Sequence, residues 1–161
     1  MRWIWMLVAA VLLSGCAAEE TMETVADVWA EPVMVVQKNL HLELPEGAAS
    51  PVADTEGGQW YDCGSFSVGV LTLPAGDVNA TVRTLSGFEK DALTVMETGG
   101  GGIDRFDFVW VTTGETGEMF HRALVLDDGN FHYCLSALGD ADKADLFRDV
   151  WQELFGSVAL G

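Results

Sequence analysis

The sequence is poor in positively charged residues. Its 161 residues include 8 Lys and Arg against 25 Asp and Glu, which gives a formal net charge of −17 at pH 7. A chain with this charge repels the phosphates of nucleic acids and the headgroups of anionic lipids. The acidic residues are spread along the chain without a long block, which is typical of a solvated surface rather than a cation-binding face. We therefore expect no nucleic-acid partner.

The sequence also lacks an apolar run long enough to span a membrane. The run from Ile4 to Leu13 has ten residues, and as a helix it would cover only about 15 Å of a hydrocarbon core about 30 Å thick. Arg2 precedes this run, and the small residues Ser14 and Gly15 follow it. This order is the pattern of an export signal. We predict that residues 1–15 are a signal peptide that is removed, which leaves a net charge of −18 because only Arg2 is lost.

Cys16 follows the two small residues that end the predicted signal. The stretch Leu13-Ser14-Gly15-Cys16 resembles the lipobox of bacterial lipoproteins. The resemblance implies that diacylglycerol is attached to the Cys16 thiol, that the signal is cut before it, and that a fatty acid such as palmitate acylates the new amine. Two or three acyl chains anchor a protein stably. The implied partner is thus a membrane, contacted through the N-terminal lipid.

The lipobox resemblance also implies a location and a division of the chain. The protein would be anchored in the cell envelope, outside the cytoplasm. If the host has two membranes, Ala17 in place of aspartate implies the outer one. Residues 16–32 are small and acidic and suit a lipidated tether, and residues 33–161 are long enough for a single domain with a core.

Cysteine is scarce in the rest of the chain. Only Cys63 and Cys134 remain, and neither has the CxxC neighbour of a redox motif or metal site. Export permits a disulfide between them, provided that the two Cα atoms lie within about 4.4–6.8 Å. The alternative is two buried free thiols. We predict the disulfide; the distance between the two Cα atoms decides between the two alternatives.

The body of the chain has the patterns of β-strands. Residues 39–45 alternate with three leucines on one face, residues 59–74 carry one or two strands, and residues 80–87 and 91–98 are weaker strand candidates around a helical turn at 87–91. Residues 98–104, TGGGGID, are predicted to form a flexible loop. Residues 105–138 contain three strands joined by the hairpin signals GETG and DDGN. Phe106, Phe108 and Trp110 share one face of these strands, but the pattern leaves open whether Tyr133 or Cys134 joins them.

A helix is predicted over residues 140–155. Asp140 or Asp142 can cap its start, and Gly156 is placed to stop it. Its helical spacing gives one apolar stripe, formed by Leu146, Phe147, Val150, Trp151, Leu154 and Phe155. The residues SVAL after the helix can add a last strand. We predict an α+β fold, mainly an antiparallel sheet with a C-terminal three-strand meander and one packed C-terminal helix.

The order of these elements resembles PsbP-like domains, which occur in bacterial lipoproteins. The resemblance rests on NLHLELPEG, on the aromatic meander from Phe106 to Tyr133 and on the closing helix that leads into LFGSVAL. It implies a fold but no functional residue, because the fold hosts unrelated roles. Tyr61-Asp62-Cys63 resembles instead the Tyr-x-Cys strand of membrane-bound lysozyme-inhibitor lipoproteins, which are small β-barrels. A barrel would not need the closing helix.

Motifs for chemistry are largely missing. His41, His121 and His132 have no metal-ligand spacing, DADKAD (140–145) lacks the glycine of a calcium loop, and no GxSxG is present. The sequence therefore predicts no cofactor, no metal site and no catalytic residue.

Three functions remain open. The first is a lipid-anchored, non-catalytic binding or envelope-associated domain, whose protein or small-molecule partner the sequence does not identify. The second is an enzyme whose site is assembled from distant residues such as His121 and His132. The third is an inhibitor of a secreted hydrolase that presents the loop at 98–104.

Overall fold

The computed structural model describes residues 34–161 except 52, 56–57 and 116. The predicted signal peptide (1–15) and the whole predicted lipidated tether (16–32), including Cys16, lie outside the described residues. The described part contains two α-helices, two short 3-10 helices and nine strands. The helical elements are α1 (Val78–Ser86), η1 (Lys90–Ala92), η2 (Ala141–Lys143) and α2 (Ala144–Ser157). The strands are β1 (Leu40–His41), β2 (Ala53–Thr55), β3 (Gly58–Asp62), β4 (Phe66–Pro74), β5 (Val95–Gly100), β6 (Ile103–Gly114), β7 (Gly117–Asp127), β8 (Phe131–Asp140) and β9 (Ala159–Leu160).

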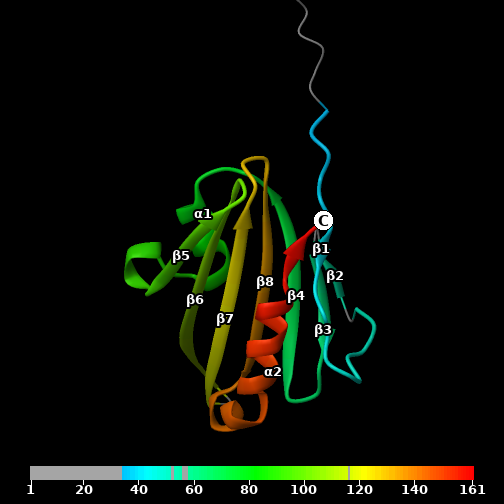
Figure 1. Ribbon diagram of the computed structural model, residues 1–161. Coiled ribbons are helices and arrows are strands. Elements are labelled where there is room, and N and C mark those ends of the chain that lie inside the picture. Colours follow the sequence, from blue (N-terminus) through cyan, green and yellow to red (C-terminus); the bar gives the residue numbers. More distant parts are fainter. Residues whose placement is uncertain (1–33, 52, 56–57, 116) are drawn as a thin grey trace, which may run out of the picture. The chain divides into compact units, whose positions relative to one another are not determined.

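Seven of the described strands form one antiparallel sheet, in the order β2-β3-β4-β8-β7-β6-β5 (Figure 1). The sheet is open, with β2 and β5 at its edges, unlike the closed barrel of the lysozyme-inhibitor alternative. β1 and β9 form a separate two-stranded sheet, so the predicted last strand is confirmed. Among the described residues, no helix combines the length and the apolar character needed to cross a membrane. The predicted α+β fold class is confirmed.

The three-strand meander is confirmed, and its register settles which side chains share a face. β6, β7 and β8 pair so that Phe106 lies opposite Val125, which in turn lies opposite Cys134. Directly paired residues point to the same side of a sheet. Cys134 therefore shares the aromatic face, and Tyr133 points to the other one.

The two faces of the sheet carry different helices. On one face α2 packs over a core to which β4, β7 and β8 contribute, and Phe147, Trp151, Leu154 and Phe155 of the predicted stripe are buried there. The three leucines of the first strand prediction, Leu40, Leu42 and Leu44, also pack against this core. On the other face α1 packs Val82 against Phe108, Trp110 and Cys134.

The C-terminal helix is confirmed, with three differences from the prediction. Leu146 is 69% exposed instead of packing in the stripe. The helix runs through Gly156 and ends at Ser157, whose hydroxyl donates to the Leu154 carbonyl oxygen at 2.9 Å. No side-chain hydrogen bond caps its start; the 3-10 turn η2 leads into it instead.

The strand predicted at residues 80–87 is wrong, because α1 occupies this segment. Asp77 caps the helix by accepting a hydrogen bond from the Asn79 N–H at 2.9 Å. Gly87 ends it in the left-handed region, with φ 79°, and donates its N–H to the Arg83 carbonyl oxygen. Both are standard helix boundaries. Here they outweigh the strand preference of the threonines and valine between them.

The flexible loop predicted at residues 98–104 is also wrong. β5 continues to Gly100 and β6 starts at Ile103, so only two residues turn the chain. Gly101 and Gly102 both have positive φ, 63° and 80°. A two-residue hairpin turn of this kind needs positive φ at both positions, which glycine adopts freely. The segment is a tight hairpin and does not form a long presenting loop.

The predicted disulfide between Cys63 and Cys134 is wrong, and both thiols are free. The Cys63 N–H bonds to the carbonyl oxygen of Phe66, which lies opposite Gly139 on β8. Cys134 is five residues from Gly139, or about 17 Å along the strand, whereas a disulfide needs Cα atoms within about 7 Å. The two side chains also pack in cores on opposite faces of the sheet. Burial raises the pKa of the Cys134 thiol to about 12.

Candidate functional site

The histidines proposed for a distant-residue enzyme site do not meet. His132 lies opposite Asp127 in β7, and His121 is six residues from Asp127 on that strand, about 20 Å away. His132 is fully buried, and its Nδ1 lies 2.7 Å from the Thr81 hydroxyl. His121 stacks on Trp110 at 4.8 Å, and burial lowers the pKa of its imidazole. Within the described ranges, no group of three His, Cys, Asp or Glu side chains could hold a metal ion.

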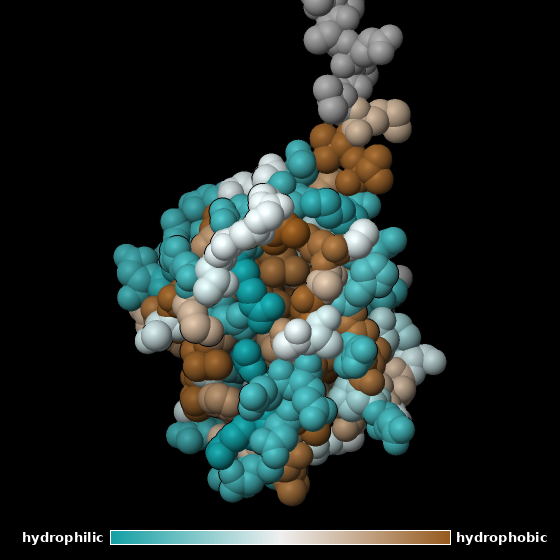
Figure 2. Space-filling view, viewed as in Figure 1, coloured by the Kyte–Doolittle hydropathy of each residue, from teal (hydrophilic) through white to brown (hydrophobic). Residues whose placement is uncertain are grey.

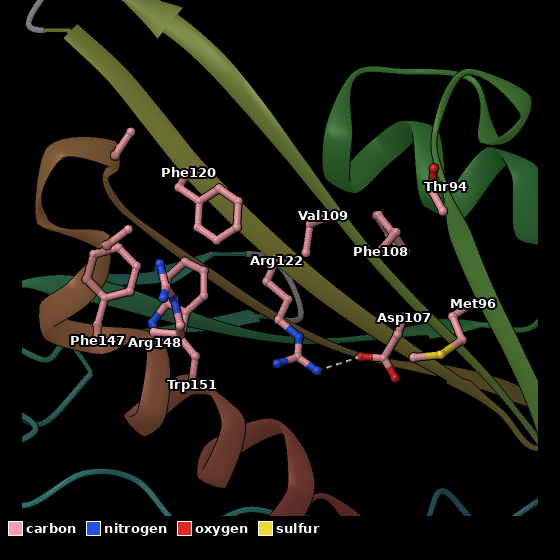
Figure 3. Close-up of a pocket in the computed structure, with 12 residues that line it drawn as sticks. Thr94, Met96, Asp107, Phe108, Val109, Phe120, Arg122, Phe147, Arg148 and Trp151 are labelled. Carbon is pink, nitrogen blue, oxygen red and sulfur yellow. Dashed lines mark hydrogen bonds and ion pairs between the residues drawn. The ribbon is translucent and has the colours of Figure 1, made fainter.

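A groove lies beside α2, on the same face of the sheet. α2 lies over one part of this face and leaves β5 and β6 to its side (Figure 1). The groove has a volume of about 520 Å³, within the range of about 300–1,000 Å³ that is usual for small-molecule sites. Its floor includes Met96 and Val109, and its wall is formed by Phe120, Phe147 and Trp151 (Figure 3).

The floor of the groove is apolar and open to solvent. Val109 and Val111 of β6 are 46% and 47% exposed, and Met96 of β5 is 60% exposed. Figure 2 shows hydrophobic surface gathered over β6, to the left of α2. Single exposed apolar residues need no explanation, but contiguous ones mark contact or ligand sites. β6 is apolar on both faces, because its other side supplies Phe108 and Trp110 to the core under α1.

Three charged side chains lie at one end of this floor. Asp107 accepts hydrogen bonds from Arg105 Nε at 2.7 Å and from Arg122 Nη2 at 3.3 Å. Arg105 Nη2 also donates to the Phe155 carbonyl oxygen at 3.0 Å, and the Arg122 guanidinium lies 4.3 Å from the centre of the Phe155 ring. Figure 3 shows Arg122 between the aromatic wall and the Asp107 carboxylate. We call Arg105, Asp107 and Arg122 the charged cluster.

A second hollow, of about 370 Å³, continues along β5 and β6 on the far side of Arg105. It is lined by Ile103, Leu126 and Leu160 among others, and Arg105 borders it. Val158, Ala159 and Leu160, which follow α2, line its other side. The charged cluster lies between an apolar compartment on each side.

The sequence reasoning missed this site. The Arg105-x-Asp107 spacing was a usable signal, because residues two apart in a strand share a face. Val109 and Val111 follow on that same face. Arg122 could be added only with the register of β6 and β7, in which it lies opposite Val109. That α2 does not cover this strip had no signal in the sequence.

Comparison with known proteins finds solved structures of similar fold but assigns the chain to no family. No family model matches the chain, and no curated protein matches its sequence significantly. The solved structure of LpqN, a protein involved in cell envelope biogenesis of Mycobacterium tuberculosis, is similar with a TM-score of 0.53 and 12% identity, over 77% of this chain and 84% of that one. The Ran-binding protein Mog1p of Saccharomyces cerevisiae has a TM-score of 0.49 and 11% identity, over 78% and 96%. Likeness at this identity concerns the fold alone.

Proposed function

We propose that this protein is a non-catalytic, lipid-anchored binding protein of the cell envelope, and that the groove beside α2 holds an apolar part of its ligand. The observation that carries the proposal is the exposed apolar floor formed by Met96 and Val109 next to the aromatic wall of Phe120, Phe147 and Trp151. Ligand sites are concave and mostly apolar, with a few polar groups placed at fixed positions. The charged cluster supplies such groups at the groove's end.

The location outside the cytoplasm rests on the sequence. The lipobox-like stretch ending at Cys16 supports an acylated N-terminus, and the PsbP-like interpretation of the body agrees with a lipoprotein. The similarity to LpqN, described as involved in cell envelope biogenesis, is compatible with the same compartment. If the host has two membranes, Ala17 favours the outer one.

Two experiments test the two parts of the proposal. Cys16→Ser should abolish labelling by a fatty-acid analogue and leave an uncleaved or mis-sorted precursor. Undiminished labelling of the variant would contradict the lipid anchor.

The groove is tested with the neutral apolar dye phenylnaphthylamine, whose emission rises in an apolar site. Val109→Trp should fill the groove and remove the rise. Val111→Trp is the matched control, because Val111 has nearly the same exposure on the same face but does not line the groove. Equal dye binding by both variants and the parent would contradict the proposal.

A further inference from the structure

The charged cluster gives the groove a local charge opposite to that of the whole protein. Arg105 and Arg122 share the single carboxylate of Asp107, so the cluster has one positive charge in excess. The neighbouring acids Glu97 and Asp104 occupy alternate positions that point to the α1 face, where Glu97 pairs with Lys90 at 2.5 Å. The groove itself is lined by Arg122 of this cluster and by Arg148, which pairs with Asp145 at 3.0 Å. In a chain of net charge −17 with only 8 Lys and Arg, the excess positive charge beside Arg122 makes this end of the groove electrostatically distinct.

The two arginines are held differently. Arg105 is fixed by two hydrogen bonds, to the Asp107 carboxylate and to the Phe155 carbonyl oxygen. Arg122 makes one longer contact with Asp107, at 3.3 Å, and its guanidinium lies over the Phe155 ring. A guanidinium has five N–H donors in a planar fork that matches a carboxylate or phosphate. Among the described residues no second acceptor bonds to Arg122, so the donors that remain are available to a ligand.

The apolar compartment begins beside this guanidinium. Arg122, Phe120 and Val109 line the same groove, and Figure 3 shows them side by side. An anionic group at Arg122 would thus have Met96, Val109 and the aromatic wall within reach of an attached apolar chain. The volume of about 520 Å³ suits one small molecule.

We propose that the groove binds a single-chain anionic amphiphile of the fatty-acid type, with its carboxylate at Arg122 and its chain along Met96 and Val109. This inference rests on the proposed function and adds the chemical class of the ligand. Charge complementarity carries it, because the protein's net negative charge disfavours anions in general, whereas the charged cluster beside the groove has a positive charge in excess. The guanidinium can give the carboxylate two parallel hydrogen bonds, which are among the stronger ones in proteins.

The test compares two amphiphiles that differ in the sign of their headgroup. Decanoate and decyltrimethylammonium are titrated calorimetrically, at equal ionic strength and below their micelle concentrations, into the mature chain (16–161) carrying Cys16→Ser. The protein's net charge favours the cation at any non-specific site. We expect decanoate to bind at least about tenfold more tightly, as one charge-assisted hydrogen bond supplies about that factor.

Variants assign the preference to Arg122. Arg122→Gln should weaken decanoate binding about tenfold or more, and Arg122→Lys should retain part of the preference because it keeps the charge. Arg83→Gln is the matched control, since Arg83 is exposed on α1 and pairs with Glu89 at 3.0 Å. Far-ultraviolet circular dichroism of each variant confirms that it is folded.

Each outcome decides one of the two claims. If both amphiphiles bind with similar affinity and Val109→Trp blocks both, the anionic preference is wrong and the apolar groove of the proposed function stands. If neither amphiphile binds to the folded chain, both claims fall. If decanoate is preferred but Arg122→Gln and Arg83→Gln behave alike, Arg122 is not the recognition residue and the inference is overturned.

Discussion

Helix α2 covers one half of its sheet face and leaves the other half open. In the covered half, β4, β7 and β8 place Phe66, Val68, Leu124 and Leu135 in the core. In the open half, Met96 of β5 and Val109 of β6 remain about half exposed on the same face. Both halves carry apolar side chains, although the open half also carries the charged cluster. The difference is how far one 14-residue helix reaches across the sheet.

Because of this difference, we expect the covered half to determine the stability of the fold and the open half to determine binding. Burying a large apolar side chain contributes about 1.5–3 kcal/mol, and the covered half obtains this contribution at each core position. The open half forgoes it at Met96 and Val109, so these side chains remain free to contact another molecule. Changes in the covered half should therefore unfold the protein, and changes in the open half should affect binding while the fold persists.

The largest effect is expected at Trp151, where α2 meets the sheet. Its ring stacks on Phe147 at 4.5 Å and on Phe120 at 5.6 Å. Trp151→Ala leaves a cavity in the covered half and should cost about 3–5 kcal/mol, which lowers the melting temperature strongly. Leu146→Ala on the exposed side of α2 is the control and should change little. Equal melting temperatures for the two variants would mean that α2 does not stabilise the sheet.

A middle effect is expected at Asp107, on the border between the halves. Its side chain is 9% exposed and holds two guanidiniums. Asp107→Asn leaves both without their counter-charge, and we expect a loss of about 1–3 kcal/mol in urea unfolding, the cost of unpairing a largely buried polar group. Asp104→Asn, an exposed neighbour on the other face, should be nearly neutral. Equal unfolding midpoints for the two variants would show that the charged cluster does not stabilise the fold.

The smallest effect is expected at Val109, and one substitution compares the halves directly. Val109→Ala removes a half-exposed side chain and should change the free energy of unfolding by less than about 0.5 kcal/mol. Val68→Ala makes the same change at a fully buried position of β4 and should cost more, because a cavity term adds to the lost burial. Similar costs, measured by thermal unfolding, would contradict the division into a covered and an open half.

Local patterns in the sequence were enough for much of the fold. The alternation around Phe106 to Trp110, the two hairpin signals and the stripe of α2 each describe neighbouring residues, and the structure confirms them except for Leu146 of the stripe, which is exposed. α1 was missed because strand-forming residues fill it, although Asp77 and Gly87 marked both of its ends. The glycine run at 99–102 was taken for a loop, whereas two positive-φ glycines make the tightest hairpin turn.

The site and the cysteine pairing depended on longer-range geometry. The separation of Cys63 and Cys134 follows from the register of β3, β4 and β8, which no single strand contains. Arg122 meets Asp107 only because β6 and β7 pair with Val109 opposite Arg122. The open floor depends on where α2 lies over the sheet. Alternation within one strand assigns a face to each residue, but it does not say what covers that face.

The central claim is that the open half of the α2 face binds an apolar ligand. Amide chemical shifts of the isotope-labelled chain 16–161 carrying Cys16→Ser, titrated with phenylnaphthylamine, test it most directly. The account predicts shifts at Val109 and Arg122 and at the Trp151 indole N–H, which has no acceptor among the described residues, with no change at Val82 in α1. Shifts confined to α1, or no shifts at a saturating dye concentration, would contradict it.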